Sequence, residues 1–179
     1  MITKKELRKT LIRKRKNLPP DYRQSADKQI FHTLTNLDTF KNAKTIFCYV
    51  SKEDEVDTHL LIKHAIDFSK RIVVPKCVER GIMHAFAIQS FDDLIPGKYG
   101  ILEPKEDCEL VCPSEIDFAI VPCLSCNSEG YRLGYGGGFY DRYLQERTFI
   151  KAAICYNELL SENIPVEEFD QKVDLIISA

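Results

Sequence analysis

Six short apolar runs recur along the chain, and segments with helical periodicity separate most of them. The runs are rich in β-branched and aromatic residues, which favour strands, and they cover Thr45–Val50, Arg71–Pro75, 82–88, Asp117–Pro122, Lys151–Tyr156 and Val173–Ser178. Near-continuous apolar runs are typical of strands that are buried on both faces of a parallel sheet. The alternation predicts an α/β fold with a mostly parallel central sheet and helices on both faces.

Helical periodicity marks several of the intervening segments. Residues 3–17 form one predicted helix, and Asp21 is a candidate cap for a second helix over residues 22–36. A third helix is expected after Asp57 or Thr58, and a fourth from about residue 138. The longer stretch between the third and fourth predicted strands, residues 91–104, is expected to be irregular, because glycine and proline interrupt it.

Length and charge restrict the classes of function. The chain has 179 residues and a formal net charge of −2, which suits one domain over residues 1–179 that buries roughly 70% of its unfolded surface. The charge gives no global reason to expect nucleic acid or an acidic membrane as a partner. Residues 1–20 lack the apolar core of a signal peptide, and no apolar run is long enough to span a membrane, so a cytoplasmic protein is expected.

The seven cysteines raise the question of a zinc site, because Cys108-x3-Cys112 is followed by Cys123-x2-Cys126. Structural zinc usually needs two tight pairs on loops that are free to fold around the metal, whereas Cys123 ends a predicted strand. An odd number of cysteines argues against a disulfide framework. Buried or loop thiols are therefore expected, and zinc is the weaker alternative.

The segment Gly130–Arg142 combines five glycines with two arginines and one aspartate. Glycine tolerates positive φ and has no side chain, so the backbone N–H groups of residues 134–138 can approach a bound anion closely. A glycine loop that opens into a helix is a ready phosphate site. Arg132 and Arg142 can neutralise phosphate oxygens, and Asp141 offers an oxygen ligand for magnesium.

This glycine-rich segment matches neither of two common nucleotide-binding motifs. A Walker A loop requires lysine and a hydroxyl residue where Phe139 and Tyr140 stand, and the dinucleotide fingerprint requires a final glycine that is missing. A flexible surface loop is the alternative interpretation. A linker does not need arginine and aspartate beside four glycines, so anion binding is the better hypothesis.

Charged residues outside the glycine loop offer further candidates. Lys4 and Arg8 project from one face of the predicted first helix, where a bound anion would relieve their repulsion; a solvated amphipathic helix is the alternative. The acidic segment Glu53–Thr58 follows a predicted strand and can bind a donor-rich ligand or a metal, or simply cap the next helix. Asp170 can join Asp141 around Mg²⁺, which needs few carboxylates.

Arg132–Arg142 resembles the signature of the 5-formyltetrahydrofolate cyclo-ligases, also called methenyltetrahydrofolate synthetases. Further segments are similar to family patterns in the same order: Lys4–Arg8, Asp54–Thr58, Gly100–Pro104 and Ile164–Asp174. The likeness covers nearly the whole chain. Phe169 departs from it, because many members carry histidine before the aspartate, and Cys123 and Cys126 fall where the family has no metal role.

The resemblance implies an enzyme that converts 5-formyltetrahydrofolate and ATP to 5,10-methenyltetrahydrofolate, ADP and phosphate with Mg²⁺, through a phosphorylated formyl group. The N-terminal helices within residues 1–36 would contribute to the nucleotide site. The implied ATP contacts are Lys4, Lys5, Leu7, Arg8, Arg132, Leu133, Gly134, Tyr135, Gly136, Gly137, Gly138, Phe139 and Tyr140. The implied folate contacts are Val50, Glu55, Tyr135, Gly136, Gly137, Gly138 and Phe139. Asp141 and Asp170 would hold magnesium, and Arg132 and Tyr140 would be catalytic.

Two other classes of function are alternatives to this enzyme. A non-catalytic nucleotide- or folate-binding protein would keep the glycine loop without turnover, but intact Arg132, Asp141 and Asp170 argue against it. A nucleic-acid binder that uses the basic first helix is disfavoured by the net charge. The expected partners are therefore small molecules, without nucleic acid or membrane, and a monomer is expected.

Overall fold

A seven-stranded, mostly parallel sheet forms the centre of the molecule in the computed structural model, which describes residues 2–97 and 100–179. The strand order is β11-β10-β7-β1-β2-β3-β6. The first five strands pair in parallel, and β3 and β6 add an antiparallel edge. The strands are β1 (Thr45–Cys48), β2 (Arg71–Glu79), β3 (Ile82–Ile88), β6 (Leu110–Val111), β7 (Phe118–Val121), β10 (Ile150–Cys155) and β11 (Leu175–Ser178).

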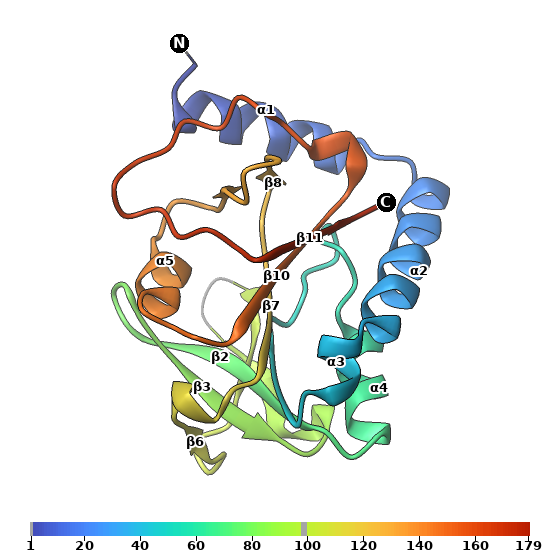
Figure 1. The fold of residues 1–179 in the computed structure, drawn as a ribbon, viewed down its shortest axis with the longest axis vertical. Helices are drawn as coiled ribbons and strands as arrows, with labels where there is room; N and C mark the ends of the chain where they lie inside the picture. The colour runs from blue at the N-terminus through green and yellow to red at the C-terminus, as the bar shows by residue number, and fades with distance from the viewer. Residues whose placement is uncertain (1, 98–99) are drawn as a thin grey trace.

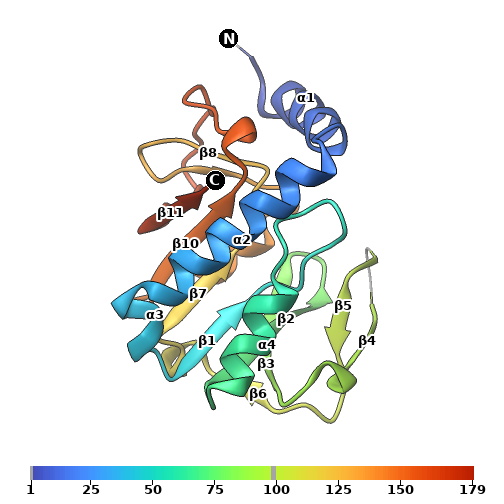
Figure 2. The ribbon, with the colours of Figure 1, turned by 90° about the vertical axis from the view of Figure 1, so that its right-hand side faces the viewer.

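Helices cover both faces of this sheet, as the sequence predicted. The helices α2, α3 and α4 lie on one face and α5 lies on the other (Figure 1), and Figure 2 shows α2 and α4 in front of the strands. Their bounds are α1 (Lys4–Lys16), α2 (Pro20–Asn36), α3 (Asp38–Asn42), α4 (His59–Asp67) and α5 (Phe139–Leu144). The first helix, α1, covers no face but crosses above the carboxyl ends of the parallel strands (Figures 1 and 2). The mixed α/β fold is thus confirmed.

The start of α2 differs from the prediction, whereas the start of α4 agrees with it and shows which of the two candidate residues supplies the cap. The second helix begins at Pro20, not after a cap at Asp21, because proline has the φ of a first helical residue and needs no N–H partner there. At the start of α4 the capping hydrogen bond comes from Asp57, whose Oδ1 accepts from the backbone N–H of His59 at 2.8 Å. Thr58 instead donates its hydroxyl to the carbonyl of Tyr49 at 2.7 Å, which ties the helix start to the end of β1.

The segment expected to be irregular contains a short hairpin. Strands β4 (Leu94–Pro96) and β5 (Leu102–Pro104) pair antiparallel, and the 3-10 helix η1 (Phe91–Asp93) precedes them. Each strand ends in a proline, which a two-stranded ribbon accommodates because its outer N–H groups need no partner. The prediction was therefore wrong for these strands, while Lys98 and Tyr99 of the same stretch lie outside the described residues. A second hairpin joins β8 (Ser125–Cys126) to β9 (Arg132–Leu133). The 3-10 turns η3 (Pro113–Glu115) and η4 (Asn157–Leu159) precede β7 and β11, respectively.

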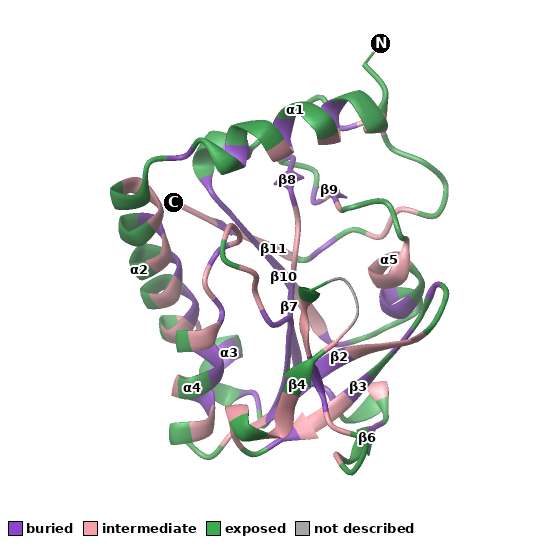
Figure 3. Cartoon of the chain, turned by 180° about the vertical axis from the view of Figure 1, so that it is seen from behind, coloured by how far each residue is buried: buried purple, intermediate pink, exposed green. Residues whose placement is uncertain are grey.

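The core lies between the sheet and its covering helices, and the central strands β1 and β7 are buried along their length (Figure 3). Phe40, Phe47 and Phe118 are among its largest fully buried side chains. Leu7 and Leu11 bury the inner side of α1, so this helix is held by apolar packing as well as by charge. All seven cysteines are free thiols, and no group of three or more metal-ligating side chains occurs among residues 2–97 and 100–179. Within the same residues, no helix has the length and apolar character needed to cross a membrane.

Truncation of a core aromatic tests this architecture. Phe118 is fully buried in β7, and its ring meets that of Phe40 edge-on, with 5.9 Å between the centroids. Phe118→Ala is expected to lower the free energy of unfolding by about 3–5 kcal/mol, because the transfer free energy is lost and a cavity remains. Urea unfolding measures the change. Phe68→Ala, at a position that is 68% exposed, is the control and should cost about 0.5 kcal/mol or less; equal losses would contradict this core.

Candidate active site

A cavity of about 440 Å³ lies beyond the carboxyl ends of the parallel strands, beneath α1. Tyr49 and Val50 follow β1 on its wall, and Pro122 follows β7. The chain runs from β1 to β2 in one direction along the sheet and from β7 to β10 in the other, so the two neighbouring strands β1 and β7 define a topological switch point. Open α/β sheets bind their ligands at such a point, and the volume suits a small molecule.

The glycine loop, residues 134–138, forms one wall of this cavity between β9 and α5. Gly136 and Gly138 have φ of +96° and +66°, values that side-chain-bearing residues rarely adopt. A Cβ at Gly136 would lie 3.2 Å from the guanidinium carbon of Arg8. The loop therefore needs glycine both for its backbone conformation and for the close approach of α1. The predicted helix that follows the loop is confirmed as α5, although it has only six residues.

The first helix, α1, covers the cavity, and two of its basic residues line it. Arg8 lies on the glycine loop and donates from Nε to the carbonyl of Gly134 at 2.8 Å. Lys4 also lines the cavity. Lys5 is exposed and Leu7 is buried in the core, and neither lines the cavity. The structure thus brings Lys4 and Arg8 to the glycine loop, as their shared helix face suggested, and leaves Lys5 and Leu7 outside.

Two carboxylates meet at the same end of the cavity, although they are far apart in the sequence. Asp141 accepts a hydrogen bond from the backbone N–H of Gln171 at 3.3 Å, which brings α5 beside the residue that follows Asp170. Each carboxylate also faces a cation. Asp141 pairs with Arg132 at 2.8 Å and Asp170 with Lys4 at 2.6 Å. This donor set fits Mg²⁺, because the ion prefers oxygen ligands, needs only one or two carboxylates and keeps several waters.

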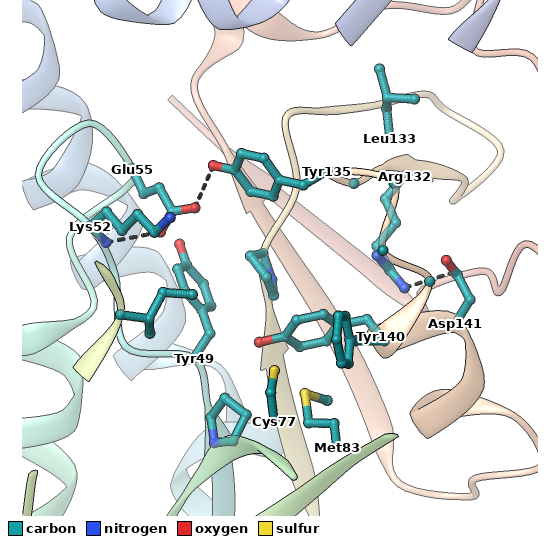
Figure 4. Close-up of a pocket in the computed structure, with 18 of the residues that line it drawn as sticks. Tyr49, Lys52, Glu55, Cys77, Met83, Arg132, Leu133, Tyr135, Tyr140 and Asp141 are labelled. Atoms are coloured by element: carbon teal, nitrogen blue, oxygen red, sulfur yellow. Dashed lines mark hydrogen bonds and ion pairs between the residues drawn. The ribbon is translucent and has the colours of Figure 1, made fainter. Parts of the chain in front are cut away.

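Arg132 and Tyr140 stand together on the wall between the carboxylates and the cavity interior. The guanidinium of Arg132 lies over the Tyr140 ring at 5.6 Å, and its Nε is buried with no hydrogen-bond partner among the described residues. Burial raises the pKa of Tyr140 well above its usual value, so the phenol remains a neutral hydrogen-bond donor. Its hydroxyl points into the cavity (Figure 4). The two groups can therefore donate to an anionic or carbonyl oxygen.

Arg142 has a different role from the one expected. Its Nε donates to the carbonyl of Gly81 at 2.7 Å and its Nη2 to the carbonyl of Gly137 at 2.6 Å. These hydrogen bonds attach α5 to the turn between β2 and β3 and to the glycine loop. The guanidinium does not line the cavity. The prediction that Arg142 neutralises phosphate charge is therefore not supported by its position. Phe169, the departure from the family pattern, is 76% exposed and also lies outside the cavity wall.

The opposite end of the cavity is closed by a hydrogen bond between two predicted site residues. Tyr135, from the glycine loop, donates its hydroxyl to Oε1 of Glu55 at 2.6 Å (Figure 4). The other carboxylate oxygen, Oε2, accepts from the backbone N–H of Lys52 at 2.9 Å. Val50 lines the cavity nearby. The acidic segment after β1 thus contributes Glu55 to the cavity, as predicted.

A largely apolar floor connects the two ends, and sequence reasoning missed it. Its side chains are Tyr49, Pro75, Cys77, Met83 and Pro122, and Lys52, Ile101 and Glu103 also line the cavity. Tyr49, Pro75 and Pro122 lie at or just beyond the ends of predicted strands, so the rule for ligands of parallel sheets was a usable signal for them. Cys77 gave no signal, because β2 was expected to end at Pro75 and instead continues to Glu79.

The cavity can therefore hold two kinds of group at once. Backbone amides of the glycine loop, the Lys4 ammonium and the Arg132 guanidinium are suited to phosphate oxygens, with carboxylates for a divalent cation beside them. The apolar floor, bounded by Glu55 and Tyr135, suits a flat heterocycle with polar edges. Such a site can bring a polyphosphate and a heterocyclic substrate into contact.

Comparisons with known proteins identify the family of this chain. The model of the 5-formyltetrahydrofolate cyclo-ligase family matches residues 1–179. The chain is 31% identical to the 5-formyltetrahydrofolate cyclo-ligase of Haemophilus influenzae over 180 aligned residues, which cover 93% of each protein. It is similar to the solved structure of Aquifex aeolicus 5,10-methenyltetrahydrofolate synthetase, with a TM-score of 0.88, 33% identity, and coverage of 99% of this chain and 90% of that one.

A second solved structure, the 5,10-methenyltetrahydrofolate synthetase of Mycoplasma pneumoniae, has a TM-score of 0.80 and 25% identity and covers 98% of both chains. The family match extends over the whole chain, and the likeness to solved structures extends over nearly all of it. The glycine loop, the basic first helix and the paired carboxylates come together in one cavity within that shared fold. The chain therefore belongs to the 5-formyltetrahydrofolate cyclo-ligase family and is a ligase.

Proposed function

We propose that this protein closes the five-membered ring of 5,10-methenyltetrahydrofolate from 5-formyltetrahydrofolate in a reaction that consumes ATP and requires Mg²⁺. The observation that carries the proposal is that one cavity combines an end suited to phosphate oxygens with an apolar end. Family membership supplies the cyclo-ligase activity, and the two ends of the cavity support the nucleotide as second substrate. The molecule is proposed to work as a cytoplasmic monomer on small molecules, without nucleic acid or membrane.

The chemistry explains why a phosphate donor is needed. The formyl group on the 5-nitrogen is amide-like, so its carbon is a weak electrophile and its oxygen would have to leave as hydroxide. Transfer of the γ-phosphoryl group from ATP to the formyl oxygen converts that oxygen into a leaving group and releases ADP. The 10-nitrogen then attacks the formyl carbon and loses its proton, and phosphate departs with the former formyl oxygen. The product is the methenyl cation.

Charge neutralisation and positioning are the protein's tasks in such a transfer. Arg132 and the amides of the glycine loop are placed to receive the phosphoryl oxygens, and Lys4 and Arg8 add charge from α1. Tyr140 can donate to the formyl or phosphoryl oxygen. Because preorganised donors stabilise charge that develops in the transition state, we assign the catalytic role to Arg132 and Tyr140.

Asp141 and Asp170 are the residues that would hold magnesium. A bound Mg²⁺ would neutralise charge on the polyphosphate and orient it for transfer. Both carboxylates now face protein cations, at 2.8 Å and 2.6 Å. We infer that Lys4 and Arg132 turn to the phosphates when the nucleotide and the metal bind, so that every charge at this end keeps a counterion.

The folate is proposed to occupy the apolar floor, with its polar edge at Glu55 and with Val50, Tyr135 and Phe139 around it. The 5-formyl group would then lie toward Tyr140 and the glycine loop. Holding the folate in this geometry makes ring closure an intramolecular step with its reacting atoms already close, which lowers the barrier by several kcal/mol.

The activity itself is tested by incubating the purified protein with 5-formyltetrahydrofolate, ATP and Mg²⁺ and following the near-ultraviolet absorbance of the methenyl product. We expect product to form only when all three are present, with one ADP released per product. A chain that binds both substrates without turnover would instead be the non-catalytic binding protein. Product formation without ATP, or none with it, contradicts the proposed reaction.

Two substitutions test the phosphate end. Arg132→Ala and Asp141→Asn should each lower kcat by about 10²–10³, because each removes a charge that acts on the transferring group. Steady-state kinetics on folded variants, checked by circular dichroism, give the comparison. Arg80→Ala and Asp92→Asn change the same residue types at exposed positions away from the cavity, and both controls should keep wild-type turnover. Full activity in either cavity variant refutes that residue's role.

Gly136→Ala tests whether the loop must let α1 approach. The added Cβ would lie 3.2 Å from Arg8 at a position with φ of +96°. We expect the KM for ATP to rise at least tenfold, since Arg8 and the loop can no longer hold their contact. Gly100→Ala introduces comparable strain, at φ of +68°, where nothing lies within 4 Å, so it should cost stability without changing that KM. Identical kinetics in the two variants would count against the docking role.

A further inference from the structure

Arg15 is a buried arginine that does not line the cavity. It lies in the last turn of α1 and is 4% exposed. Arginine is almost never fully buried unless it is paired, because removal of its charge from water is costly. Its partners should therefore indicate what the side chain is for.

Three groups from two other segments surround the Arg15 guanidinium. Its Nε and Nη2 both donate to Oδ2 of Asp54, at 3.0 Å and 2.7 Å. Its Nη1 lies 4.0 Å from Oε1 of Glu55, and its guanidinium carbon lies 5.3 Å from the centroid of the Tyr135 ring. Arg15 thus contacts the acidic segment after β1 and the glycine loop at the same time. A planar guanidinium with several donors suits such a junction better than an ammonium does.

Two of these partners close the apolar end of the cavity. Tyr135 and Glu55 share the 2.6 Å hydrogen bond that bridges the glycine loop and the segment after β1. Tyr135 is 47% exposed, and both the Arg15 guanidinium and the Glu55 carboxylate lie against it. Lys52 contributes a backbone N–H to Glu55 at 2.9 Å, and its ammonium lies 5.9 Å from the Tyr135 ring. The hydrogen bond between Tyr135 and Glu55 therefore depends on the positive charge of Arg15 beside it.

The geometry points to Arg15 as a positioning residue for the folate end of the cavity, which acts by holding the Glu55–Tyr135 bridge in place. The inference rests on the proposed function, in which Glu55 and Tyr135 contact folate. Lys4 and Arg8 lie on the same helix, and eleven residues of α-helix separate Lys4 from Arg15 by about 16 Å. One rigid helix thus carries the cations for the phosphates at one end and the positioning residue for the folate wall at the other.

The test compares Arg15→Met, which keeps an unbranched apolar stem without the charge, with Arg15→Lys, which keeps the charge and the stem but loses the planar set of donors. Arg13→Met is the matched control, because Arg13 is exposed on the same helix. Calorimetry measures the Kd of 5-formyltetrahydrofolate, and steady-state kinetics give KM for each substrate. We expect Arg15→Met to weaken folate binding at least tenfold while the KM for ATP changes less than threefold. Arg15→Lys should recover part of the loss, and Arg13→Met should match wild type.

A double-mutant cycle separates positioning from general destabilisation. Tyr135→Phe should weaken folate binding in the wild-type background and have little further effect in Arg15→Met, because the bridge is already loose there. If Arg15→Met does not fold, Asp54→Asn replaces it in the same cycle; this substitution removes the charge that orients Arg15 and should act in the same direction. Unchanged folate affinity in folded variants, equal losses for both substrates, or additive effects would overturn the inference.

The binding measurement keeps this inference distinct from the proposed reaction. If the wild-type protein binds 5-formyltetrahydrofolate but forms no product with ATP, the reaction is wrong and the Arg15 comparison still stands on the Kd values. If turnover is normal and the Arg15 variants bind as wild type does, only the positioning role fails. A wild-type protein that does not bind 5-formyltetrahydrofolate would overturn both.

Discussion

The site depends on the docking of α1 across the carboxyl edge of the sheet. Arg8 reaches the Gly134 carbonyl at 2.8 Å, and a Cβ at Gly136 would lie only 3.2 Å from its guanidinium carbon. Leu7 and Leu11 bury the inner side of the same helix. Without this helix the cavity would be an open sheet edge with a glycine loop, and its phosphate end would lose the cations that come from the chain's N-terminal segment.

Docking of α1 also reduces the repulsion among its own positive charges. The helix carries eight lysines and arginines against one glutamate, and such a helix repels itself unless anions face it. Two carboxylates supply this negative charge. Asp170 forms an ion pair with Lys4 at one end of the helix, and Asp54 forms one with Arg15 at the other. In the proposed reaction the phosphates of the nucleotide replace Asp170 as the partner of Lys4. The ion pair between Arg15 and Asp54 remains and holds the folate end of the cavity in place. Under the proposed function, one basic helix would thereby serve both substrates through different counterions.

The fold followed from local pattern, because buried parallel strands produce apolar runs that are visible in the sequence. The glycine loop, the Lys4–Arg8 face and a place for Asp170 beside Asp141 were also predicted from the residues. The contacts that individual side chains make in the folded chain were not predicted. Arg142 looks like a phosphate ligand in the sequence, yet its guanidinium donates hydrogen bonds to two backbone carbonyls. The role of Arg15 depends on contacts across 39 and 120 residues of chain, for which spacing gives no signal.

The central claim is that α1, the glycine loop and the Asp170 segment form one nucleotide site. Hydrogen–deuterium exchange, measured by mass spectrometry with and without ATP and Mg²⁺, tests it most directly. The account predicts that the nucleotide slows exchange together in peptides from Lys4–Lys16, from 132–141 and from 167–171. Protection confined to the glycine loop, with exchange in α1 and in 167–171 unchanged, would contradict it.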